Sequence, residues 1–167
     1  MAAKRWAALA LAVPGLAAFL VLAHPRLVPL PELLVSEPGG RLLAAIELPD
    51  GRFDHVFVHS VHRSEVVERF AIEASGRGRA TLRLYELRYE NQGVGMPSDA
   101  EGGYRLEDGR FVLSMDRRFE KIPIFVSVLP GHGLLANGAY LPFRNWARPE
   151  TLIVLSAKTR THILLGR

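Results

Sequence analysis

Apolar and polar residues alternate through most of the chain after residue 41, in short runs separated by Gly, Pro, Asn and Asp. This two-residue period is typical of strands with one wet face, and no run has a convincing helical period. Short strands with tight turns and no crossover helices favour an all-β fold, either an antiparallel β-sandwich or a partly closed barrel. We expect about eight strands, over residues 42–48, 53–61, 66–74, 80–89, 110–115, 122–129, 152–157 and 162–165.

Two irregularities in the pattern make local predictions. The alternation changes phase between Leu84 and Leu87, which requires a bulge to keep both halves facing the core, and we place it near Tyr85. Pro123 interrupts an apolar run and has no N–H to donate to a neighbouring strand. We therefore expect Pro123 on an edge strand or at a bulge.

The first 23 residues have a different pattern. Lys4 and Arg5 precede an uncharged run rich in Ala, Leu and Val that ends in small residues. This arrangement predicts a secretory signal peptide or, because the run reaches the lower limit for crossing a bilayer, one hydrophobic helix anchored in the inner membrane. The rest of the chain is then exported to the periplasm, with a proline-rich tether over 24–40 and a β domain over 41–167.

Charge and cysteine content exclude several classes of function. Without Lys4 and Arg5 the chain has 19 basic against 17 acidic residues, with no block of like charges, so we expect no nucleic-acid partner. The absence of cysteine excludes a disulfide framework, a thiolate metal site and a Cys nucleophile. No motif indicates a cofactor.

The runs at 53–61 and 66–74 flank a short polar segment and predict a β-hairpin. A tight turn would pair His59 with Glu68 and His55 with Ile72. The better core face then carries an imidazole and a carboxylate opposite each other, close enough for a charge-assisted hydrogen bond.

This polar pair allows two interpretations. One is a general base oriented by Glu68, with Ser60 as nucleophile, although Ser60 would project from the opposite face of the strand to His59. The other, which we favour, is a structural pair that sets the hairpin register. A metal site is not predicted, because His55 and His59 would lie roughly 13 Å apart on an extended chain and His132, in a glycine-rich turn, is expected to be solvated.

Several segments resemble a small uncharacterised bacterial family encoded beside TRAP transporters of the TAXI type. They are Val58–Val61 with its His-Ser pair, Glu68 before Phe70, Tyr89, and the loop with Gly93, Gly95 and Pro97. The resemblance covers roughly residues 42–155 and implies an exported β domain whose motif positions are His59, Ser60, Glu68, Tyr89, Gly93, Gly95 and Pro97. This chain departs from the family pattern at His62 and Met96.

The resemblance implies association with solute uptake and no established activity. Our first hypothesis is a noncatalytic exported accessory or binding module whose partners are TRAP transporter subunits. The alternative is a periplasmic hydrolase or metal-dependent enzyme that uses His59, Ser60 and Glu68, and a third hypothesis is a purely structural envelope domain. The position of these three side chains in the fold separates the first two hypotheses.

Overall fold

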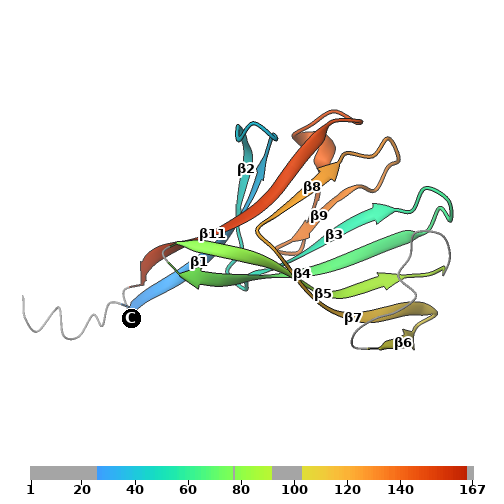
Figure 1. Cartoon of the computed structure of the whole chain (residues 1–167), viewed down its shortest axis with the longest axis horizontal. Helices are drawn as coiled ribbons and strands as arrows, with labels where there is room; N and C mark the ends of the chain where they lie inside the picture. The colour runs from blue at the N-terminus through green and yellow to red at the C-terminus, as the bar shows by residue number, and fades with distance from the viewer. Residues whose placement is uncertain (1–25, 77, 92–102, 165–167) are drawn as a thin grey trace, which may run out of the picture. The chain divides into compact units, whose positions relative to one another are not determined.

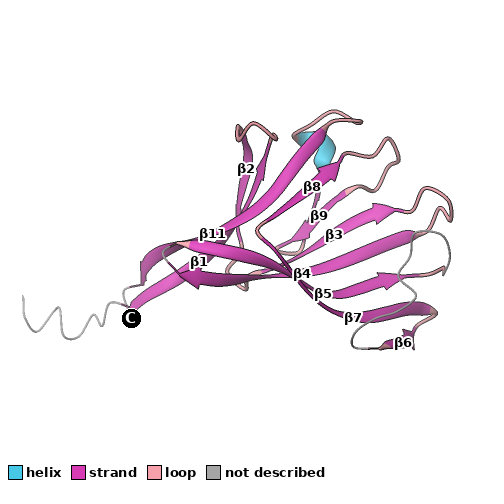
Figure 2. Ribbon diagram, viewed as in Figure 1, coloured by secondary structure: helices cyan, strands magenta, loops and turns pink. Residues whose placement is uncertain are grey.

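The computed structural model describes residues 26–76, 78–91 and 103–164. These residues form strands and loops, with a single short 3-10 turn at Phe143–Asn145 (Figure 2). The N-terminal hydrophobic helix predicted over 1–23 and the loop with Gly93, Gly95 and Pro97 lie outside the described residues. Within the described part of the chain, no helix has the length and apolar character needed to cross a bilayer.

The all-β prediction is confirmed. The strands, all paired in antiparallel fashion where a register is defined, are β1 (Arg26–Ser36), β2 (Leu42–Glu47), β3 (Arg52–Val58), β4 (Glu65–Gly76), β5 (Arg79–Tyr89), β6 (Tyr104–Glu107), β7 (Arg110–Phe119), β8 (Lys121–Phe125), β9 (Gly133–Ala136), β10 (Ala139–Pro142) and β11 (Leu152–Leu164).

Residues 30–160 form one compact unit, and the other described residues are 26–29 of β1 and 161–164 of β11. The main strand order is β10-β9-β3-β4-β5-β11-β1-β2, with β6, β7 and β8 attached beside it (Figure 1). Within the compact unit the sheet is a half-barrel, which agrees with the partly closed barrel among the predicted architectures.

The sheet divides at β5 and β11. These two strands pair at Arg79 and Lys158, and they then separate, because β5 continues along β7 whereas β11 continues along β8. Only Glu120 lies between β7 and β8, so one nearly continuous stretch of chain pairs first with one strand and then with the other. We call β10-β9-β3-β4-β5-β7-β6 the large branch and β2-β1-β11-β8 the small branch.

The apolar core joins the two branches. Phe53 and Phe70 of the large branch stack with ring centroids 5.1 Å apart, and Leu33 and Leu155 of the small branch are fully buried in the same cluster. Burial of such side chains contributes roughly 1.5–3 kcal/mol each, and within the described residues no cysteine or metal cluster supplements it.

Both predicted irregularities are confirmed. The register of β5 with β4 shifts between Leu84 and Glu86, so Tyr85 is the extra residue of a bulge in that pair. The register of β5 with β7 shifts at the same place, but there the extra residue belongs to β7. Pro123 lies in β8, whose only described partner is β11, so it occupies an edge strand. The predicted strand segments fall on β2, β3, β4, β5, β7, β8 and β11, the last of which covers both predicted C-terminal segments.

The predicted tether is wrong for residues 26–36, which form β1. Leu33 and Val35 are completely buried there. Pro29 and Pro31 suggested an extended linker, but β2 pairs only with residues from Glu32 onward, so the prolines lie outside that ladder and remove none of its hydrogen bonds. The β domain therefore begins before residue 41. The short strands β6, β9 and β10 were also not predicted.

Candidate functional site

The predicted register of the β3–β4 hairpin is wrong. His55, not His59, lies opposite Glu68, and Phe57 lies opposite Val66. The loop between the strands has six residues, 59–64, because β3 ends at Val58 and β4 begins at Glu65. The change of register keeps the same residues on each face, so an imidazole still faces a carboxylate on the core side as predicted.

His59 instead closes the hairpin loop. Its backbone N–H donates to the carbonyl of Ser64 at 2.9 Å, and its Nδ1 accepts from the backbone N–H groups of Val61 and His62, both at 3.3 Å. The rings of His59 and His62 stack with centroids 4.9 Å apart. His59 therefore organises the turn and is not hydrogen-bonded to Glu68.

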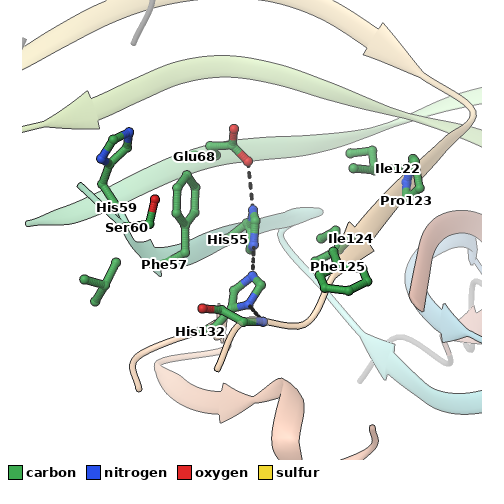
Figure 3. A pocket seen from close by; sticks show the side chains of 12 residues that line it. His55, Phe57, His59, Ser60, Glu68, Ile122, Pro123, Ile124, Phe125 and His132 are labelled. Atoms are coloured by element: carbon green, nitrogen blue, oxygen red, sulfur yellow. Dashed lines mark hydrogen bonds and ion pairs between the residues drawn. The ribbon is translucent and has the colours of Figure 1, made fainter. Parts of the chain in front are cut away.

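A chain of three hydrogen bonds runs from Glu68 to the loop before β9 (Figure 3). Glu68 Oε2 lies 2.8 Å from His55 Nδ1, and His55 Nε2 lies 2.9 Å from His132 Nε2. The chain ends where His132 Nδ1 accepts from the backbone N–H of Ser127 at 2.8 Å. We call Glu68, His55 and His132 the relay.

The Ser127 bond determines the tautomers of both imidazoles. Because His132 Nδ1 accepts a hydrogen bond, it carries no proton, and the proton of the neutral ring is on Nε2. His132 therefore donates to His55 Nε2, so His55 carries its own proton on Nδ1 and donates it to Glu68. All four ring nitrogens are engaged in the relay, and both histidines are neutral.

His132 is buried, which contradicts its predicted exposure to solvent. It is 8% exposed and packs edge-on against Phe143, with ring centroids 4.9 Å apart. Burial, reinforced by the neighbouring His55, lowers the pKa of His132 from the usual 6.5 to about 4, although Glu68 acts in the opposite direction. This low pKa agrees with the neutral form required by the hydrogen bonds.

The relay forms one wall of a pocket of about 450 Å³, a size suited to a small molecule. Figure 3 shows the relay on one side and β8 on the other. Because the pocket follows the free edge of β8, residues from both faces of that strand line it. The lining residues are His55, Phe57, Val58, His59, Ser60, Glu68, Ile122, Pro123, Ile124, Phe125, Ser127 and His132.

Three of the predicted site residues, His59, Ser60 and Glu68, line this pocket. Ser60 is exposed in the hairpin loop, whereas Tyr89 is 1% exposed and stacks on Phe111 in the core at a centroid distance of 5.5 Å. The sequence interpretation missed the roles of His55 and His132. Gly133, the next residue, lies too close to the β10 backbone to carry a Cβ. A glycine beside His132 was the one feature of the sequence that could have drawn attention to this position.

The relay is poorly suited to bind a metal ion. Two facing Nε2 atoms resemble an empty pair of zinc ligands, and Glu68 behind His55 is a common partner of a metal-bound imidazole. However, His132 Nε2 carries the proton and has no lone pair to offer while Ser127 donates to Nδ1. In the described part of the chain, no group of three or more His, Asp or Glu side chains is arranged to hold an ion.

Comparison with known proteins identifies a family but no activity. No curated protein and no solved structure matches the chain. A family model described as a domain of unknown function, DUF1850, matches residues 53–143, which is more than half of the chain. The match contains β3 to β10, including all three relay residues. The chain therefore belongs to the DUF1850 family.

Proposed function

We propose that the protein is an exported, noncatalytic binding module that works with a TRAP-type solute transporter. Export is supported by the basic and apolar pattern of residues 1–23. The transporter link is supported by the resemblance to domains encoded beside TAXI-type TRAP systems. In this role the domain resides in the periplasm, free or held at the inner membrane, and presents its pocket to a solute or to a transporter subunit.

The proposed binding role rests on the pocket, because the two histidines in one of its walls already make their hydrogen bonds within the protein. Both histidines of the relay use every ring nitrogen in hydrogen bonds to protein groups. A polar wall that is already hydrogen-bonded keeps its shape without a ligand, and such preorganisation reduces the entropic cost of binding. The opposite wall is apolar, from Ile122 to Phe125, and supplies contact area.

The hydrolase hypothesis has no support from this geometry. Nucleophilic catalysis needs a hydroxyl within hydrogen-bond reach of a base that a third group orients. Glu68 orients His55 rather than His59, and His59 Nδ1 is occupied by the backbone of the hairpin loop. We therefore do not propose a reaction for Ser60.

Crosslinking in intact cells tests the partnership. The full chain, with an affinity tag at its C-terminus, is crosslinked in the native host, purified from membranes and analysed by mass spectrometry. We expect TRAP subunits to be enriched over a control in which residues 1–25, which precede β1, deliver an unrelated exported domain. Equal recovery of TRAP subunits by the two proteins would contradict the proposal.

The same preparation tests export. Mass analysis of the N-terminus shows whether residues 1–23 are removed or retained, and protease added to spheroplasts shows on which side of the membrane the domain lies. Protection of the domain from added protease would contradict a periplasmic location.

A further inference from the structure

In the part of the chain that the structure describes, the pocket carries a single negative charge, which favours cationic ligands over anionic ones. Glu68 is the only Asp, Glu, Lys or Arg side chain among its described lining residues, and the relay histidines are neutral. The Glu68 side chain is 27% exposed, so it is neither buried in the core nor fully hydrated. One carboxylate oxygen accepts from His55, and the other points away from that ring (Figure 3).

The surroundings of Glu68 favour a particular kind of cation. The rings of Phe57 and Phe125 line the same pocket, and aromatic faces attract ammonium groups. Ile122, Pro123 and Ile124 add an apolar surface that a hydrated metal ion would not use. The pocket thus combines one negative charge, aromatic rings and an apolar wall.

We propose that this pocket binds a small organic cation, an amine carried on an apolar body, with Glu68 as its counter-ion. The inference rests on the proposed binding role and adds the class of ligand. The ammonium group donates to the free oxygen of Glu68, and the apolar body lies along β8 against Phe125. The Ser60 hydroxyl lines the same pocket and is a second acceptor available to the ammonium group.

A matched series of probes tests the charge preference on the purified domain. The probes are 2-phenylethylammonium, 2-phenylethanol and 3-phenylpropanoate, which share a phenyl group and differ in charge. Binding is followed by ¹H–¹⁵N NMR at the amides of Phe57, Glu68 and Phe125. We expect the amine to bind at least roughly tenfold more tightly than the alcohol, because a charge-assisted hydrogen bond is added, and we expect the carboxylate not to bind.

Two pocket variants and one control locate the effect. Glu68→Gln keeps an oxygen that can accept from His55 but removes the charge, so we expect amine binding to weaken roughly tenfold. Phe125→Leu, at a side chain that is 63% exposed, should weaken it roughly two- to fivefold. Glu120→Gln, at an exposed carboxylate that is not among the lining residues, should leave it unchanged.

The outcomes separate this inference from the proposed function. Equal binding of the amine and the alcohol, or unchanged amine binding in Glu68→Gln, overturns the ligand class and leaves the binding role standing. If none of the three probes shifts the pocket amides, the ligand class fails, and the crosslinking result alone decides the transporter partnership. Amine binding without crosslinked TRAP subunits supports the ligand class and contradicts only the transporter partnership.

Discussion

At the scale of single residues, the hydrogen bonds of the relay are compatible with only one arrangement of protons on its two imidazoles. If His55 gained a second proton, its Nε2 would face a His132 Nε2 that already carries one. If His132 gained a proton on Nδ1, it would face the N–H of Ser127. A second proton on either histidine therefore breaks one hydrogen bond of the relay. An unmade bond at a buried polar group costs roughly 1–3 kcal/mol.

This arrangement predicts acid sensitivity of folding. The pKa of His132 is about 4 in the folded protein and close to 6.5 when unfolded, so the unfolded chain binds the proton more readily. Stability should be complete above about pH 6.5 and fall by about 3 kcal/mol as the pH drops toward 4. The titratable groups facing His132 are His55 and Glu68.

Urea unfolding of wild type and His132→Asn between pH 4 and pH 8 measures this contribution. The difference between the two stabilities separates His132 from other titratable groups, such as Asp54, whose pKa is raised by burial. We expect the wild type to lose more stability than the variant on acidification. Parallel curves would rule out His132 as the source.

At the scale of elements, His132 directly precedes β9, which pairs with β10 on one side and with β3 on the other. Gly133 begins β9, and its backbone passes so close to β10 that an added Cβ would lie 2.5 Å from the carbonyl oxygen of Leu141 and 2.8 Å from Cα of Pro142. The next residue along, Leu134, pairs with His55 itself. The backbone next to His132 is therefore packed closely between β3 and β10.

Gly133→Ala should separate β9 from β10 and destabilise the domain by roughly 1–3 kcal/mol, because the clashing atoms belong to the backbone. Gly39→Ala is the matched control, since no heavy atom lies within 4 Å of its added Cβ. Denaturant midpoints of the two variants give the comparison. Equal midpoints would show that β9 and β10 tolerate the extra atom, contrary to this account.

Side-chain direction within the strands could be predicted from the sequence, whereas the register of the hairpin could not. Alternation identified the core face of β3 and β4 and the bulge at Tyr85, because side-chain direction depends only on neighbouring residues. The hairpin register, in contrast, depends on the geometry of the loop. The loop here has six residues and includes Arg63 at a φ of +54°. The shorter turn expected from the sequence therefore placed His59 instead of His55 opposite Glu68.

At the scale of the whole molecule, long-range assembly creates the site. His132 is 77 residues from His55 in sequence, and the wall opposite the relay comes from β8. β8 reaches that position because β5 and β11 separate and the chain crosses from one to the other at Glu120. The alternation of apolar and polar residues does not indicate where the chain changes its partner strand. Neither the pocket nor the role of His132 could therefore be predicted from the sequence.

Glu68, His55 and His132 form a closed relay in which both histidines are neutral, and this relay shapes one wall of the binding pocket. Long-range ¹H–¹⁵N NMR of the imidazole rings at pH 7 tests this arrangement most directly, because the two tautomers of a neutral ring give different nitrogen shifts. We predict a proton on Nδ1 of His55 and on Nε2 of His132, with both spectra unchanged by added Zn²⁺. A proton on Nδ1 of His132, or zinc-dependent shifts at both Nε2 atoms, would contradict the account.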